Sequence, residues 1–501
     1  MRPCTAAALV VAAVLAGCNS GDDEGAGGSG REGGSVVVGL ATAPDSMDPA
    51  MASTPEALQA VWLAHTPPLT YARREGAAGT ALVPGLAEKA PEPSGDGLMW
   101  EFTLRSGLTY SDESRVRASD FERGIRRARG LNPSARSAFA RVKAISADDR
   151  SRRVRIDLER PDPLLPYALA STWASPVPAG TPSRKLAAVP GVGPYVVARR
   201  ERGMAYVLTR RRALELPGIP RGNVDVISGR VVPSVTARTT AAIAGGLDAM
   251  QGEPVTTALP EIRSKYEGRY AEHRTLSSHY VRFDLDRLPF RDEDMRRAVS
   301  FALDERTLVR LQDGFLSPSC NVIPPAVAGH RAADPCPYGE REGNADLVEA
   351  RDLVEGSPDA DARVLVDGGT GRVADALARY GVETLDKIGL RARLARNAAE
   401  RERAQLRFAS TRPAIPHPAR YLEPAGDALL ASRVGLLERA GSPAEEAGRW
   451  AELDREVVSD ALLAPYGVGT TGTLLSERLD AENCLRFHPV HGLDLSSLCV
   501  R

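Results

Sequence analysis

One stretch of this chain is unusually informative: residues 100–121 read WEFTLRSGLTYSDESRVRASDF. Apolar and polar side chains alternate from Leu98 to Leu104, and this two-residue period predicts a strand with one buried face. Residues 106–107, Ser-Gly, then predict a turn. Ser119 and Glu122 have the spacing of a capping box, so a helix is expected to follow. Its buried face would carry Phe121, Ile125 and Ala128.

The rest of the chain alternates between further strand and helix patterns. Alternating apolar residues predict strands at 36–40 and 154–158. Between Val364 and Leu394 the pattern reads strand, helix, strand, a unit whose two strands pair in parallel. One helix is expected over the apolar stripe Met295, Ala298, Val299 and Ala302, and a second helix after a cap at Asp304. A third, long helix is expected to begin at Ser442, Pro443 and Glu445, with Trp450, Val457 and Ala461 facing inward. These patterns predict an α/β protein.

The N-terminus has the pattern of an export signal. Arg2 precedes an apolar run that is too short to span a hydrocarbon core of about 30 Å. The run closes with LAGC at residues 15–18, an order that resembles the bacterial lipobox and implies that Cys18 carries the lipid of the mature protein. Residues 1–17 are then the signal peptide, and residues 18–35, rich in Gly, Asp and Glu, form a flexible lipidated tether. The alternative is an ordinary secretory signal with an incidental cysteine.

Charge and cysteine usage restrict the partners further. A formal net charge of −1 over 501 residues argues against nucleic acid as a binding partner. No second apolar stretch reaches membrane-spanning length, so the membrane is expected to be contacted through the lipid alone. Once Cys18 is lipidated, an oxidising exterior favours two short-range disulfides, Cys320 with Cys336 and Cys484 with Cys499. Free thiols and a zinc site are the alternatives, although neither pair has the spacing of a zinc knuckle.

Two long motifs give the chain a specific resemblance. The stretch quoted above, in order and spacing, is similar to the hallmark segment of the family 5 extracellular solute-binding proteins of ABC importers, the peptide and nickel binders. Residues 283–304 resemble the second hallmark of the same family. Shorter matches are the Gly-Val-Gly-Pro-Tyr turn at 191–195, Gly-Leu-Asp-Ala at 246–249, the Pro-Pro pair at 324–325 and residues 347–354. The resemblance covers nearly all of residues 36–470.

This resemblance implies a two-lobed, periplasmic-binding-protein-like clamshell with mixed sheets and a discontinuous first lobe. Lobe one would comprise residues 36–278 and 467–501, with an extra subdomain at about 55–175, and lobe two residues 279–466. A strand-forming run at 278–285, which precedes a complete α/β set, independently supports a division there. A peptide or another small solute would bind between the lobes of a monomer, and ABC permease subunits would read the closure of the hinge.

The solute site implied by the family is altered in this chain. Peptide binders of the family hold the ligand's ammonium group with an Asp, in a loop that also contains a Trp, because a charge-assisted hydrogen bond in a dry cleft is strong. Residues 408–421, FASTRPAIPHPARY, match that loop. They place Thr411 in the Trp position and Ala414 in the Asp position, so the amine anchor is absent, while Arg412 offers a cation suited to an anionic solute. The candidates for solute contact are Asp45, Ser46, Trp173, Thr411, Arg412 and Tyr421.

Other motifs are weaker. Residues 467–472 spell G-x-G-x-x-G, but they follow a long helix, whereas a dinucleotide site needs this pattern between a strand and a helix. Residues 368–371 are expected to form a tight turn between strand and helix, with an anion cradle as the alternative. His488 and His491 flank Pro489 without a nearby third ligand, which favours structural or surface roles over a metal site. We therefore expect no catalytic residue, metal or cofactor, and the common hydrolase motifs are missing from the sequence.

Three function classes fit these patterns. The leading one is a lipid-anchored receptor on the extracytoplasmic face of the cell membrane that delivers a peptide or peptide-like solute to an ABC permease. The second is a surface lipoprotein of the same fold with a sensing or interaction role, or a binder of a metal chelate of the nickel type. The third is a secreted enzyme on the same scaffold, which the absence of a nucleophile and base pair disfavours.

Overall fold

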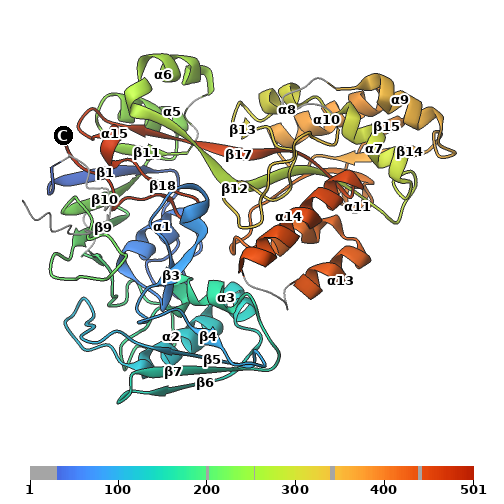
Figure 1. Ribbon diagram of the computed structural model, residues 1–501. Coiled ribbons are helices and arrows are strands. Elements are labelled where there is room, and N and C mark those ends of the chain that lie inside the picture. Colours follow the sequence, from blue (N-terminus) through green and yellow to red (C-terminus); the bar gives the residue numbers. More distant parts are fainter. Residues whose placement is uncertain (1–30, 199–201, 253, 255, 339–344, 438–442) are drawn as a thin grey trace, which may run out of the picture.

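The computed structural model describes residues 31–198, 202–252, 254, 256–338, 345–437 and 443–501. It is an α/β protein of two lobes, which Figure 1 shows side by side and joined by two long strands. The expected signal peptide, Cys18, most of the tether and Ser442 lie outside the described residues. None of the described helices is long and apolar enough to cross a bilayer.

One mixed sheet of eleven strands runs through both lobes, in the order β15-β14-β16-β12-β17-β11-β1-β10-β9-β8, with β13 paired to β17. Its strands are β1 (Ser35–Leu40), β8 (Tyr195–Val197), β9 (Tyr206–Arg210), β10 (Val226–Val231), β11 (Ala249–Gln251), β12 (Tyr270–Phe283), β13 (Leu316–Ser317), β14 (Arg363–Asp367), β15 (Arg391–Leu394), β16 (Leu406–Thr411) and β17 (Leu463–Leu475). β1 pairs in parallel with β10 and β11, and β14 pairs in parallel with β15 and β16. The parallel unit expected between Val364 and Leu394 is therefore confirmed.

β12 and β17 carry the chain between the lobes, antiparallel to each other. The first half of β12 pairs with the end of β17 next to β11, and its second half pairs with both the start of β17 and β16. The register shifts between Arg274 and Ser278, where the strands cross from one lobe to the other. β12 begins eight residues before the strand expected from Ser278, because its first half is only partly buried and lacks the continuous apolar signal of its second half.

Lobe one packs helices on both faces of its part of the sheet. Its helices are α1 (Pro55–Ala64), α2 (Ala118–Leu131), α3 (Pro133–Ala138), α4 (Leu165–Leu169), α5 (Val235–Ile243), α6 (Leu259–Lys265) and α15 (Ala481–Cys484). Successive strand residues point to opposite faces, so Ala249 packs in the core that contains α1, whereas Met250 packs with α5 and α6. Figure 1 shows α5 and α6 above the sheet and α1 below it.

A second, four-stranded antiparallel sheet forms the extra subdomain of lobe one, in the order β4-β5-β7-β6. Its strands are β4 (Glu92–Pro93), β5 (Met99–Thr103), β6 (Val142–Asp148) and β7 (Arg153–Leu158), and the hairpin β2 (Leu69–Tyr71) and β3 (Leu82–Pro84) lies in the same core. Phe102 of β5 meets Phe121 of α2 edge to face at 5.8 Å, so the expected strand and helix pack directly on each other. The core of this subdomain begins at Leu69 and not at about 55, because α1 packs against the large sheet.

Two local expectations in the opening stretch were wrong. α2 begins at Ala118, and its capping contact runs from the backbone N–H of Arg117 to Oδ2 of Asp120 (2.9 Å), while the Ser119 hydroxyl donates to Asp149 instead. Asp120 is preferred because it also accepts the Tyr110 hydroxyl, which ties the helix start to the preceding loop. Leu98 is 37% exposed, since β5 begins only at Met99.

Like lobe one, lobe two has helices packed on both faces of its part of the sheet. Its helices are α7 (Glu293–Ala302), α8 (Glu305–Leu311), α9 (Leu347–Glu355), α10 (Arg372–Lys387), α11 (Ala398–Glu402), α12 (Ala419–Leu422), α13 (Ala428–Leu437) and α14 (Pro443–Ser459). Val281 of β12 packs with α7 and α10, and its neighbour Tyr280 packs with α12 and α14 on the other face. Asp304 caps α8 as expected, through the N–H of Thr307. Ala461 is buried but lies beyond the end of α14, with φ +49°.

Both expected disulfides are present. Cys320 and Cys336 close a loop that packs against α14, and Cys484 and Cys499 join α15 to the C-terminal segment. Their Cα atoms are 5.7 Å and 5.6 Å apart, within the range of native disulfides. The C-terminal segment, which β17 has returned to lobe one, contains the small hairpin β18 (Phe487–His488) and β19 (Gly492–Leu493) beside α1.

A buried ion pair fixes the turn before α1 to the extra subdomain. Both carboxylate oxygens of Asp48 accept from Arg127 of α2, at 2.7 and 2.5 Å, and both side chains are almost fully enclosed. Burial by itself raises the pKa of Asp48, but the hydrogen bonds from Arg127 and from the N–H of Leu186 hold that pKa below its usual value. The pair is thus ionised at neutral pH and joins two separate hydrophobic cores.

Removing one partner of this pair is expected to destabilise the protein strongly. Arg127→Met leaves a buried carboxylate without its counter-charge, which costs about 3–5 kcal/mol of unfolding free energy. Arg126→Met is the matched control, because Arg126 pairs with Glu122 on the exposed face of the same helix and such pairs contribute about 0–1 kcal/mol. Urea unfolding of both variants measures the difference, and equal midpoints would contradict a stabilising role for the buried pair.

Asp454 of α14 holds the first disulfide loop in place. It accepts hydrogen bonds from Asn321 Nδ2 (2.8 Å) and from the N–H groups of Val322 (3.0 Å) and Ile323 (3.4 Å). Burial raises the pKa of Asp454 to about 6, against the opposing effect of these hydrogen bonds. Because the folded-state pKa lies above the unfolded one, the stabilising contribution is complete below about pH 4 and is lost as the pH rises through 6.

This shift predicts a pH-dependent difference between the protein and Asp454→Asn. The neutral amide does not titrate, so the protein should lose about 2–3 kcal/mol relative to the variant between pH 4 and pH 7. Urea unfolding of both proteins at the two pH values gives this difference directly, because the other titrating groups cancel. A difference that stays constant with pH would show that Asp454 does not titrate in this window.

Candidate functional site

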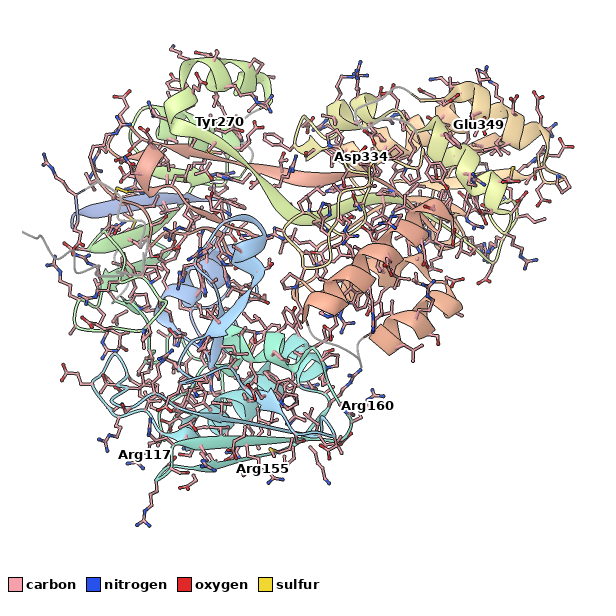
Figure 2. The ribbon with its side chains drawn as sticks, viewed as in Figure 1. Arg117, Arg155, Arg160, Tyr270, Asp334 and Glu349 are labelled. Carbon is pink, nitrogen blue, oxygen red and sulfur yellow. A yellow bond between two sulfur atoms is a disulfide. The ribbon has the colours of Figure 1, made fainter. Side chains whose placement is uncertain are left out.

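A pocket between the two lobes is the strongest candidate site. It has a volume of about 410 Å³ and is lined on one side by α3, Leu164 and Trp173 of lobe one, and on the other by Pro413, Ala414 and Ile415 of lobe two. Arg160, labelled in Figure 2, lines the pocket from the end of the extra subdomain that faces lobe two. The pocket therefore exists only because the two lobes approach each other.

The lobe-two wall is a rigid loop that follows β16. Three prolines, at 413, 416 and 418, restrict its backbone and remove three N–H donors. His417 anchors the loop: its buried ring meets Trp450 of lobe two at 5.4 Å and Tyr167 of lobe one at 5.6 Å. Burial, together with a smaller effect of nearby Arg420, lowers the pKa of His417 to about 4, so the ring is neutral at physiological pH.

Trp173 is the aromatic side chain on the lobe-one wall. It is half-buried against the core of the extra subdomain, and its Nε1 is shielded from solvent without a hydrogen-bond partner among the described residues. An indole N–H normally finds an acceptor when it is shielded from water. Trp173 therefore offers an apolar surface and an unused donor next to the pocket.

Thr411 and Arg412 lie where the lobe-two wall meets the strands that connect the lobes. Thr411 ends β16 and pairs with Ser278 of β12, directly beside the register shift. Arg412 is exposed, and no hydrogen bond or ion pair joins its guanidinium to any residue in the described parts of the chain. Burial nevertheless lowers the pKa of Arg412, with an opposing effect of Tyr421.

Tyr421, Asp45 and Ser46, three further candidates for solute contact, form hydrogen bonds within the protein. Tyr421 is fully buried in the lobe-two core, and its hydroxyl donates to the carbonyl of Leu276 (3.0 Å). Asp45 accepts from the backbone and hydroxyl groups of Ser53 and Thr54 at the start of α1, and Ser46 is buried and accepts from the N–H of Asp48. Their polar atoms are used within the protein, and contact of these three residues with a solute stays a prediction.

Sequence reasoning overlooked a cluster of aromatic and basic side chains on lobe one. The guanidinium carbon of Arg73 lies 3.2 Å from the ring centre of Trp62, and the ring of His491 stacks on the same indole at 4.0 Å. Arg73 also pairs with buried Asp494 (3.4 Å), and burial lowers its pKa to about 10. His491 was noticed in the sequence, but the stacking partner Trp62 comes from α1, more than 400 residues away, and leaves no local signal.

His488 is a structural histidine. Its Nδ1 accepts from the N–H groups of Val490 and His491, and its Nε2 contacts the carbonyl of Ala72 at 3.1 Å. Both ring nitrogens are thus used, and the expected structural role holds. Among the described residues the only cluster with metal-ligand spacing is Asp480, Cys484 and Cys499, whose cysteines form a disulfide and are not free to bind an ion.

The glycine motifs also have conformational explanations. Gly467, Gly469 and Gly472 all lie within β17, with no helix after them. A Cβ at Gly469 would lie 3.1 to 3.2 Å from the side chains of Thr275, Ser277 and His279, so glycine permits the close crossing of β12 and β17. Residues 368–371 form the tight turn into α10, where Gly369 and Gly371 have positive φ angles.

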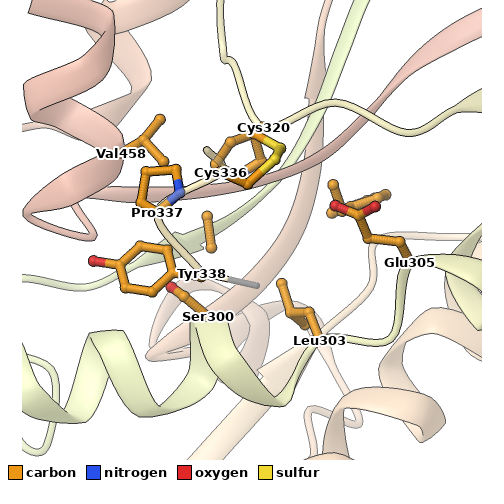
Figure 3. A pocket seen from close by; sticks show the side chains of 11 residues that line it. Ser300, Leu303, Glu305, Cys320, Cys336, Pro337, Tyr338 and Val458 are labelled. Atoms are coloured by element: carbon orange, nitrogen blue, oxygen red, sulfur yellow. A yellow bond between two sulfur atoms is a disulfide. The ribbon is translucent and has the colours of Figure 1, made fainter. Parts of the chain in front are cut away.

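A second cavity is too small for a solute. It lies beside the Cys320–Cys336 disulfide, between Leu303, Pro337 and Tyr338, as Figure 3 shows. Its volume of about 30 Å³ accommodates only one or two water molecules. Of these two cavities, only the interlobe pocket is large enough for a solute.

Comparison with known proteins identifies the family. Residues 81–421 match the model of the bacterial extracellular solute-binding proteins, family 5 Middle. The chain belongs to this family. Among curated relatives, the probable D,D-dipeptide-binding periplasmic protein DdpA of Escherichia coli K12 is 24% identical over 291 residues, 56% of this chain and 55% of the relative. The glutathione-binding protein GsiB of Salmonella typhi is 22% identical over 311 residues, 60% of this chain and 58% of the relative. The matched region thus spans a little over half of these relatives.

Solved structures confirm the periplasmic-binding-protein fold over nearly the whole chain. The clavulanic acid biosynthesis oligopeptide binding protein 2 superposes with a TM-score of 0.81, 21% identity, and coverage of 94% of this chain and 96% of its own. The murein tripeptide binding protein MppA, in its unliganded open form, gives a TM-score of 0.78, 17% identity, and coverage of 94% and 99%. The two-lobed fold expected for this family 5 protein is therefore confirmed.

Proposed function

We propose that this family 5 protein is a lipid-anchored, extracytoplasmic receptor that binds a peptide or peptide-like solute between its lobes and delivers it to an ABC permease. The observation that carries the proposal is the pocket lined by both lobes. A solute in that pocket contacts lobe one and lobe two at once, so its binding energy favours the arrangement in which the lobes are close. The peptide-binding names of the relatives support the solute class.

The proposed motion is a rotation of the lobes about the register shift in β12. In our proposal lobe one comprises residues 36–278 and 467–501, and lobe two residues 279–466. The lobes have separate hydrophobic cores, and the direct contacts between them include the Thr80 hydroxyl on the carbonyl of Ala326 (2.6 Å) and the Tyr167–His417 ring contact. Small contacts of this kind can rearrange without disturbing either core.

Solute binding is expected to compact the protein. The experiment isolates the solute that co-purifies with the protein, identifies it by mass spectrometry and adds it back to solute-free protein. Small-angle scattering should then show a smaller radius of gyration, with the solute recovered unchanged. Measurable binding at constant radius would argue for a rigid interaction protein, and consumption of the solute would argue for an enzyme.

The same solute should bind less tightly when the aromatic wall is removed. Trp173→Ala deletes an apolar surface and an unused donor at the pocket, and a loss of about 10- to 100-fold in affinity is expected from calorimetry. Val348→Ala, which removes an exposed apolar side chain on α9, is the control and should leave affinity unchanged. Equal affinities for both variants would place the solute elsewhere.

The proposed anchor is tested independently of the solute. Cys18→Ala removes the only residue of the lipobox that accepts the lipid, so the protein should move from the membrane fraction to the soluble fraction. Mass spectrometry of the wild-type N-terminus should find a lipid on Cys18. Retention of the variant in the membrane fraction would contradict the anchor and leave the receptor function standing.

A further inference from the structure

A pocket at the outer end of lobe two, the distal pocket, is lined mainly by arginines. It has a volume of about 570 Å³ and lies where β14, β15 and β16 begin, whereas the interlobe pocket lies beyond the end of β16. Figure 1 shows β14 and β15 in the part of lobe two that is away from lobe one. The described residues that line the distal pocket include no carboxylate, and its five arginines are Arg287, Arg363, Arg391, Arg393 and Arg403.

The pleat of the sheet brings two of these arginines together on one face. Val364 of β14 and its register partner Ala392 of β15 pack against the lobe-two core. The preceding residues, Arg363 and Arg391, are also register partners and therefore point to the opposite face, on strands about 4.8 Å apart. Like charges on neighbouring strands destabilise a sheet. The fold itself therefore gives no reason for this pair of arginines.

Gln405 holds the segments around the pocket in place. Its Nε2 donates to the carbonyls of Leu288 (3.2 Å) and Arg363 (3.0 Å), and its Oε1 accepts from the N–H of Leu365 (2.9 Å). The side chain thus joins the loop after β12 to the start of β14. The distal pocket is therefore built on hydrogen-bonded backbone and does not depend on the placement of long side chains alone.

The positive charge of the pocket is only partly balanced. Three of its arginines pair with carboxylates outside the pocket, all in partly exposed pairs: Arg287 with Asp284 (3.3 Å), Arg391 with Asp361 (3.5 Å) and Arg393 with Glu400 (3.0 Å). Such exposed pairs are weak. The guanidinium groups of Arg363 and Arg403 form no hydrogen bond or ion pair with any residue in the described parts of the chain. At least two positive charges therefore remain without a partner.

These charges fit a phosphate group better than a carboxylate. A guanidinium presents its N–H donors in a planar fork that matches the oxygens of either group. A phosphate monoester, however, carries a charge of about −1.5 to −2 at neutral pH and three strong acceptor oxygens, whereas a carboxylate carries a single charge. The volume of the pocket lies in the range of small-molecule sites.

We propose that the distal pocket binds a small, soluble anion that carries phosphate groups. Arg363 and Arg403 donate to the phosphate oxygens, and the anion also offsets the repulsion between Arg363 and Arg391. The site lies at the opposite end of the lobe-two strands from the interlobe pocket, so this inference goes beyond the proposed receptor function and does not depend on it.

The test measures binding of pyrophosphate to the purified protein by calorimetry. In about 0.15 M salt, which screens exposed charges beyond about 8 Å, pyrophosphate should bind at one site. Its Kd should rise at least about 10-fold in the double variant Arg363→Gln/Arg403→Gln, because charge-assisted hydrogen bonds are lost. Citrate, which has a similar charge on carboxylates alone, should bind more weakly to the wild-type protein.

Arg379→Gln/Arg455→Gln is the matched control and should bind pyrophosphate as the wild-type protein does. It removes the same charge from two exposed arginines of α10 and α14 that form no hydrogen bond or ion pair with the described residues. Arg363 and Arg403 are likewise exposed, so their variants should fold normally. Pyrophosphate should raise the melting temperature of the wild-type and control proteins and leave that of Arg363→Gln/Arg403→Gln unchanged.

Several results would overturn the inference. Equal loss of affinity in both double variants, or equally tight binding of citrate, would reduce the site to a patch that attracts any anion. The remaining source of phosphate is a membrane surface, tested by sedimenting Cys18→Ala protein with phosphatidylglycerol vesicles. Sedimentation that requires Arg363 and Arg403, in a protein that does not bind pyrophosphate, would assign the arginines to lipid headgroups and contradict a small-molecule site.

Discussion

The two lobes share one hydrogen-bonded sheet, and the antiparallel pairing of β12 with β17 is the constraint on which the rest of the structure depends. Two unpaired linkers would allow the lobes to separate freely. The two strands are paired with each other, and β12 is also bonded to β16 in lobe two, while β17 is also bonded to β11 in lobe one and to β13 in lobe two. This pairing restricts relative motion to twisting near the register shift at 274–278. The interlobe pocket is therefore formed by walls whose relative position has few degrees of freedom.

The division of hydrophobic packing explains why the site lies between the lobes. Each face of the large sheet is covered by helices of its own lobe, and the buried ion pair of Asp48 and Arg127 ties the extra subdomain to lobe one. The apolar surface is therefore buried within each lobe, and among the described residues few contacts join the two lobes directly. Arg412 and the Nε1 of Trp173, polar groups without a partner among the residues that the structure describes, are found at this boundary.

Glycine and proline have opposite roles on the two sides of this boundary. Gly469 allows β12 and β17 to cross within van der Waals contact of each other, so that the connection is narrow. The prolines at 413, 416 and 418 stiffen the loop that forms the lobe-two wall, which reduces the conformational entropy lost when a solute binds against it. A narrow connection and a stiff wall are consistent with the proposed closure of the two lobes as rigid bodies.

Local patterns were predicted well because their physical cause is local. The alternation around Trp100 and Phe102, the apolar stripe of α7, the cap at Asp304 and the parallel unit of β14, α10 and β15 depend on residues a few positions apart. The short-range cysteine pairs follow from the same proximity. Where two local solutions compete, the prediction was wrong: Asp120 and not Glu122 caps α2, because a tertiary partner, Tyr110, also holds its carboxylate.

The sequence by itself determined the α/β class, the family motifs and the disulfides, since each depends on spacing along the chain. It did not determine which polar side chains are free to meet a solute, and only the tertiary structure decided that. Tyr421 was assigned to the site from its position in a motif, yet its hydroxyl bonds Leu276 within the core. Trp62 and His491 have no relation in sequence and stack at 4.0 Å in the fold. A side chain is available for binding only when its neighbours in space leave its polar atoms unpaired, and those neighbours are set by packing between distant segments.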